Sequence, residues 1–145
     1  MKSLLTVRFL YAVAALYEGL LGLAFVVAAP RIFQLAAITP PNHWGYMHFA
    51  AGILVIFGYM FSQFSLRPLE NRNLILYGVL LKICYVGTVG WHWCHGGIPA
   101  MWIWFAVADT LFALLSLWSL VAIKAATSDI GSRAAILTLL DQSLA

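Results

Sequence analysis

Four long apolar stretches dominate this chain, and each is long enough to cross a membrane as a helix. They cover residues 7–29, 43–64, 73–93 and 99–123. A helix needs roughly 20 apolar residues to cross a hydrocarbon core of about 30 Å. Only 9% of the residues are charged, against about 25% in a typical soluble domain. Because the connections between stretches are short, the sequence predicts an all-α integral membrane protein, with a four-helix antiparallel bundle over residues 1–124.

Two segments outside these spans have apolar residues at helical spacing. Residues 31–39 combine Arg31 and Gln34 with apolar residues such as Ile32, Phe33 and Leu35, which predicts a short interfacial segment on the outer surface. Residues 125–145 are expected to form a cytoplasmic amphipathic helix, on the membrane surface or against a partner. Its apolar face is formed by Ile130, Ala134, Leu137, Leu140 and Leu144.

The distribution of basic residues predicts the orientation of the chain. One side of the membrane has only Arg31. The other side has all the remaining basic residues that lie outside the spans or near their ends. These are Lys2, Arg8, Arg67, Arg72, Lys124 and Arg133. Basic residues collect on the cytoplasmic side, so both termini are predicted to be cytoplasmic. The net charge of +3 comes from these scattered helix ends, which argues against nucleic acid as a partner.

Three ionisable residues, Glu18, Lys82 and Asp109, lie inside spans. Counting from the span ends places all three near the bilayer centre, where a charge costs roughly 2.5–3.5 kcal/mol. We therefore expect them to meet inside the bundle. Tyr85 shares a helix face with Lys82, and His48 lies on a face with small residues. The sequence thus predicts a polar centre of these five side chains at the bilayer midplane.

The charges of this centre do not balance, because Glu18 and Asp109 face the single ammonium of Lys82. A lone excess charge in a low dielectric is costly, so we expect a proton, a charged His48, a cation or a cationic ligand to neutralise it. Two interpretations remain open. The centre is a functional site, as charges inside membranes often are, or it is a structural pair that fixes helix register.

All four histidines lie in the outer half of the predicted bundle. The segment 91–97 contains His92, Cys94 and His95, and His43 lies on the same side. Imidazole and thiolate ligands suit copper or zinc, and a haem held between His48 and another histidine is a further prediction. The alternative is that these histidines only mix with tryptophans at the boundary between water and lipid.

Short motifs in all four spans carry a family resemblance. They are Tyr17-Glu18-Gly19-Leu20-Leu21-Gly22, His48 with Gly52, Leu81-Lys82, and Ala108-Asp109-Thr110-Leu111-Phe112. With these motifs the chain resembles the DoxX-like group of small four-span bacterial membrane proteins over roughly residues 5–123. The resemblance implies a four-helix fold and a bacterial inner membrane. Some members of the group are subunits of quinone-linked sulfur oxidoreductases, although this chain has no motif for thiosulfate chemistry.

Three functions fit these features. The first is a small integral membrane binding or accessory subunit, whose polar centre holds a ligand or fixes its association with a larger membrane complex or a second copy. The second is a membrane redox enzyme or metal-binding component. It would use Glu18 and Asp109 as acid and base toward a quinone-like substrate, or outer histidines with copper or haem. The third is a proton-coupled small-molecule transporter.

Overall fold

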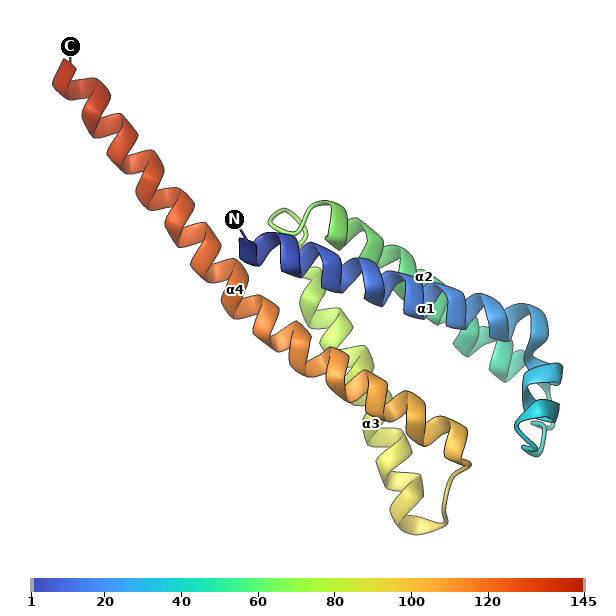
Figure 1. Ribbon diagram of the computed structural model, residues 1–145. Coiled ribbons are helices and arrows are strands. Elements are labelled where there is room, and N and C mark those ends of the chain that lie inside the picture. The colour runs from blue at the N-terminus through green and yellow to red at the C-terminus, as the bar shows by residue number, and fades with distance from the viewer. Residues whose placement is uncertain (1, 145) are drawn as a thin grey trace.

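The computed structural model describes residues 2–144, which form four helices (Figure 1). The helices are α1 (Lys2–Leu35), α2 (Trp44–Leu66), α3 (Leu74–His95) and α4 (Ala100–Leu144). Each contains a stretch long and apolar enough to cross a membrane, and the described residues form no strand. The predicted all-α fold is confirmed, with four helices that are long and apolar enough to cross a membrane.

Most of the surface of these helices is apolar. Only 22–33% of the most apolar window of each helix is buried inside the protein. The exposed remainder includes Phe9, Leu20, Phe49 and Leu111. Such a surface is consistent with an integral membrane protein, because lipid instead of water then covers the apolar side chains.

The helices form two hairpins that diverge toward one end (Figure 1). Helix α1 packs along α2, and α3 packs against α4, whereas α2 and α3 make little contact. The first hairpin is tight because two glycines allow the backbones to approach. A Cβ atom on Gly58 would lie 2.7 Å from the backbone nitrogen of Gly19, and one on Gly22 would lie 2.7 Å from the carbonyl oxygen of Ala51. Small residues are typical of such interfaces in membranes.

The half of the bundle near the N-terminus is filled by side chains from all four helices. We call it the closed half. The rings of Tyr11 and Phe64 have centroids 4.1 Å apart, and the Tyr11 hydroxyl hydrogen-bonds to Ser119 Oγ at 3.2 Å. Its buried core consists of Val7, Tyr11, Ala14, Phe61, Phe64, Ile75, Val79, Ala122 and Ile123.

The opposite half, which we call the open half, has a smaller buried core formed by Phe25, Ala29, Phe33 and Ala51. The two hairpins diverge here, and aromatic side chains span the distance between them. The Phe25 ring of α1 stacks on the Trp102 ring of α4, with centroids 6.0 Å apart. Large aromatic rings thus connect the two hairpins in the open half.

Helix α1 continues past the proline that the sequence analysis placed after the end of the first span. Pro30 lies inside the helix, and Ala28 has non-helical angles, with φ −130° and ψ 19°. Proline lacks an N–H, and its ring displaces the preceding turn, so it bends the helix at this point. Residues 31–35, part of the predicted interfacial segment, form the bent end of α1 and not a separate element.

Helix α4 continues without interruption from the fourth span to Leu144. Figure 1 shows its C-terminal part extending beyond the bundle, past the N-terminus. The backbone over residues 125–144 is therefore helical, as predicted, but it is continuous with the span. The side chains on which the predicted amphipathic face depends lie outside the described residues; they are those of Ile130, Ala134, Leu137, Leu140 and Leu144.

Candidate functional site

Three charged side chains from three helices meet between the closed and the open half. Lys82 of α3 donates a hydrogen bond of 2.7 Å from Nζ to Oδ1 of Asp109 on α4, and the same ammonium contacts Oε1 of Glu18 on α1. Glu18, Lys82 and Asp109 are only 1%, 2% and 7% exposed. The structure therefore brings the three together away from lipid, as the cost of a lone charge in hydrocarbon predicts.

The periodicity of each helix explains why these three side chains face the interior. Residues three or four positions apart lie on the same helix face. Glu18, Lys82 and Asp109 each follow a buried apolar residue by one turn, so each charge continues the face that its helix buries. Those preceding residues are Ala14, Val79 and Ala106.

Two aromatic rings complete the surroundings of the ammonium. Lys82 Nζ lies 5.3 Å from the centroid of the Tyr17 ring and 5.7 Å from that of Phe112. The two rings stack on each other, with centroids 5.4 Å apart. Attraction to ring faces stabilises a cation most where water is excluded. Lys82 therefore has two carboxylates and two rings around it.

A cavity of about 290 Å³ lies beside this charge cluster in the open half. Residues of all four helices line it, and Glu18 and Asp109 form its charged end, whereas Lys82 is not part of the lining. The rest of the lining is largely apolar, and much of it is aromatic. The rings belong to Tyr17, Phe25, Tyr85, Trp102 and Phe105.

The cavity opens sideways. Ala50 of α2 and both Cys84 and Thr88 of α3 line the cavity and are exposed to the outside. These two helices also make little contact with each other. The opening therefore lies between α2 and α3, on a surface that lipid covers when the helices span a membrane.

Two tyrosines add hydroxyl groups to the lining. The Tyr85 hydroxyl donates a hydrogen bond of 3.3 Å to the carbonyl oxygen of Trp102. The Tyr17 hydroxyl is buried and has no hydrogen-bond partner within the described residues. A buried polar group without a partner is costly. Tyr17 thus has a donor and an acceptor available to a bound molecule.

The two other predicted members of the polar centre have different positions. Tyr85 lines the cavity together with the two acids. The structure does not bring His48 to this centre, because its side chain is exposed and lies outside the cavity lining. Helix α2 turns Met47, Ala51 and Leu54 toward the cavity. His48 follows Met47 by one residue, which rotates it about 100° around the helix.

The predicted metal ligands at the end of α3 do not form a cluster. Among the described residues, no group of three or more His, Cys, Asp or Glu side chains is arranged to hold a metal ion. His92, Cys94 and His95 are all exposed. The ring of His95 stacks on that of Trp91 with centroids 4.0 Å apart, and its Nδ1 lies 2.8 Å from the Trp91 carbonyl oxygen.

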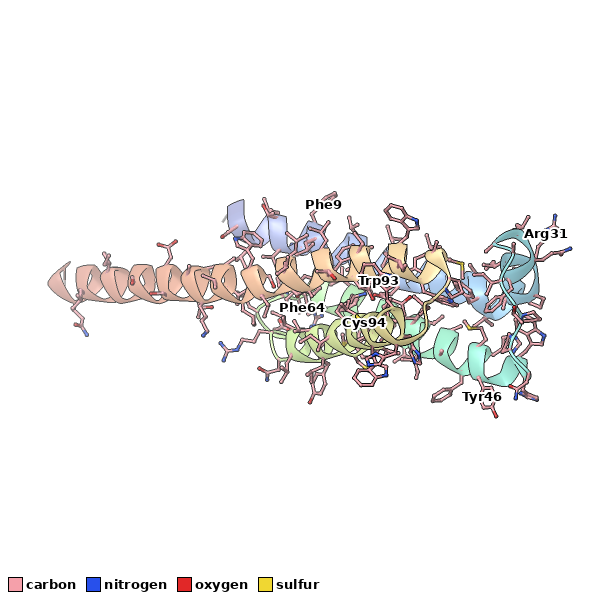
Figure 2. All side chains as sticks on the ribbon, turned by 90° about the horizontal axis from the view of Figure 1, so that it is seen from below. Phe9, Arg31, Tyr46, Phe64, Trp93 and Cys94 are labelled. Atoms are coloured by element: carbon pink, nitrogen blue, oxygen red, sulfur yellow. The ribbon has the colours of Figure 1, made fainter. Side chains whose placement is uncertain are left out.

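His43 has a local structural role at the start of α2. Its Nδ1 accepts a hydrogen bond of 3.0 Å from the backbone N–H of Gly45 and so caps the helix, and its ring contacts that of Tyr46. Figure 2 shows Tyr46 well separated from Cys94 at the end of α3. His43 is therefore not a neighbour of the other predicted ligands.

Sequence reasoning missed the cavity and most of its aromatic lining. One signal was present, because Phe105 precedes Asp109 by four residues and Trp102 precedes it by seven, which places both rings on the face of the buried acid. Nothing in this periodicity indicates that a space lies between these rings and α2. That depends on how far the hairpins diverge.

Comparisons with family models, curated proteins and solved structures find no match to this chain. The resemblance to the DoxX-like group stays a prediction. The functional argument therefore rests on the chemistry and geometry of the site itself.

Proposed function

We propose that this protein is a small integral membrane binding subunit, and that its cavity holds a ligand that enters from the bilayer. One observation carries this proposal: a largely apolar cavity ends on two buried carboxylates, Glu18 and Asp109. An ion pair that only fixed helix register would need no such space beside it. Ionisable groups inside membranes usually mark functional sites.

The lining and the opening favour a ligand that is already dissolved in lipid. Binding sites for small molecules are mostly apolar, with a few convergent polar groups, and begin at about 300 Å³. The cavity, at about 290 Å³, suits a compact molecule or one ring of a larger one. The exposed positions of Cys84 and Thr88 at its edge would let an apolar molecule enter between α2 and α3 without crossing water.

The same proposal makes the protein an accessory part of a larger membrane complex, formed with other subunits or with a second copy. The C-terminal part of α4 supports this, because it extends beyond the bundle (Figure 1). The distribution of basic residues supports cytoplasmic termini, and the DoxX-like resemblance supports a bacterial inner membrane. Mild detergent extraction should then recover the protein with its partners.

The binding proposal is tested by identifying small molecules that co-purify with the protein from its native membrane. Thr88→Trp places a large ring at the cavity edge, whereas Ile83→Trp places the same ring on an exposed position of α3 that does not line the cavity. Mass spectrometry should find one enriched compound with the wild type and with Ile83→Trp, and not with Thr88→Trp. Equal enrichment in all three proteins, or bulk lipid alone, would contradict the proposal.

A second candidate function is a redox component that binds a quinone-like ring. The unpartnered hydroxyl of Tyr17 favours it, since this hydroxyl and the carboxylates of Glu18 and Asp109 are groups that exchange or share protons with a carbonyl ligand. In that case the enriched compound absorbs in the near ultraviolet and its spectrum changes on reduction. An enriched compound without such a spectrum would remove this candidate.

A further inference from the structure

We propose that the ligand of the cavity is a lipophilic organic cation, with an apolar body and one amine or quaternary ammonium group. This inference rests on the proposed function, because it names the chemical class of the molecule that the cavity binds. Three features of the described residues lead to it: the charge balance of the cluster, the side of the cluster that faces the cavity, and the rings of the lining.

The charge balance comes first. Lys82 contacts both Glu18 and Asp109, so one ammonium faces two carboxyl groups. The cavity lining contains no Lys, Arg or His, so no residue of the lining adds a second positive charge. With both acids ionised, the cluster has one excess negative charge in a place that water hardly reaches. A cation bound beside the two acids would balance this charge.

The arrangement of the cluster determines which charged groups face a ligand in the cavity. Glu18 and Asp109 both line the cavity, and Lys82 lies behind them, outside the lining. A molecule in the cavity therefore contacts carboxylates before it can approach the ammonium. An anionic group would be repelled there, and a neutral group would leave the excess charge unbalanced.

The aromatic lining distinguishes an organic cation from a metal ion. Ring faces attract ammonium groups, and this attraction is strongest where water is excluded. Tyr17, Tyr85 and Phe105 line the cavity together with the two acids, so the rings and the charges act on the same ligand. Ions such as calcium need six to eight oxygen ligands, which a largely apolar lining does not supply. The rings instead suit the carbon body of an amine.

The test uses the full-length protein in phosphatidylcholine nanodiscs and three probes with one carbon skeleton. 4-Phenylbutylamine is a cation, 4-phenylbutanol is neutral, and 4-phenylbutyric acid is an anion. Isothermal titration calorimetry measures their binding, and empty nanodiscs give the background. We expect the amine to bind at least about 30-fold more tightly than the alcohol, because only the amine gains the attraction of the carboxylates and ring faces in a site with little water. The acid should not bind.

Variants link this preference to the cluster. Asp109→Asn leaves Glu18 paired with Lys82 and removes the excess charge, so the amine should bind no more tightly than the alcohol. Glu18→Gln should have the same effect and provides a second variant if the first folds poorly. The matched control is Glu70→Gln. It removes an exposed carboxylate that pairs with Arg67 far from the cavity, and should keep the full preference.

The outcomes separate this inference from the proposed function. Equal binding of the amine and the alcohol by the wild type would overturn the inference that the ligand is a cation. The cavity would still be a binding site. The same conclusion would follow if Asp109→Asn and Glu18→Gln kept the preference. Failure of all three probes to bind would overturn the inference. Separately, enrichment of the co-purified compound in the Thr88→Trp protein to the same level as in the wild type would overturn the binding function.

Discussion

The closed and the open half of the bundle are built from the same four helices, yet they are packed in different ways. In the closed half, Tyr11 and Phe64 fill the space between helices that lie close together. In the open half, the hairpins diverge, and Phe25 and Trp102 span part of the gap. The charge cluster lies at the boundary. The comparison indicates that one half holds the fold together, while the other is free to hold a ligand.

The glycines differ in the space that surrounds them. In the closed half, a Cβ atom on Gly78 would lie 2.6 Å from the ring of Phe61. In the open half, Gly52 of α2 and Gly87 of α3 have no atom within 4 Å of such a Cβ. Glycine is thus needed where helices pack closely, as it also is at Gly22, where an added Cβ would meet Ala51 of the open half, and it has no steric role at Gly52 and Gly87.

The largest effect is expected at the boundary itself. Lys82→Met leaves the carboxylates of Glu18 and Asp109 buried without their shared partner, and breaking a buried pair in this way typically costs about 3–5 kcal/mol of unfolding free energy. Reversible unfolding in bicelles measures the loss. Lys124→Met, at an exposed position of α4, is the control and should change stability little. A loss below about 1 kcal/mol for Lys82→Met, the level of an exposed ion pair, would show that the cluster does not connect the two halves.

The glycine comparison gives the next effect in size, with opposite signs at Gly58, where two helices touch, and at Gly52, which has free space around it. Gly58→Ala forces apart α1 and α2, because its Cβ would meet the Gly19 backbone, and such overpacking costs about 1–3 kcal/mol. Gly52→Ala has free space and should stabilise the helix by up to about 1 kcal/mol. Unfolding of both variants under the same conditions measures the difference. Equal losses at both positions would mean that Gly52 is packed as closely as Gly58.

The charge cluster could be predicted from the sequence because hydrocarbon imposes a simple rule on it. Counting from the span ends gives the depth of Glu18, Lys82 and Asp109, and the cost of a lone charge requires that they meet. No comparable rule exists for apolar positions. Residues that face lipid, a neighbouring helix or a cavity are all apolar, so the positions of Phe25 and Leu54 in the cavity lining could not be recognised from hydropathy.

Rotation and bending of the helices were the other limits. His48 was predicted to face the centre because glycines share its side of α2, but Gly52 has free space around it and marks no helix contact. Pro30 was taken as the end of the first span, whereas the helix bends there and continues to Leu35. The rotation of α2 depends on contacts between helices, which a single span does not encode, whereas a proline in a helical sequence is compatible with either an end or a bend.

The smallest effect compares two tyrosine hydroxyls, one in each half. Tyr11→Phe removes the hydrogen bond to Ser119 in the closed core, which should cost about 1 kcal/mol. Tyr17→Phe removes a buried hydroxyl that has no partner within the described residues, so the ligand-free protein should keep its stability or gain slightly. Unfolding of both variants without ligand measures this difference.

If the Tyr17 hydroxyl binds the ligand, Tyr17→Phe should weaken binding, whereas Tyr11→Phe should not. A larger stability loss from Tyr17→Phe than from Tyr11→Phe would mean that the open half depends on polar contacts as much as the closed one.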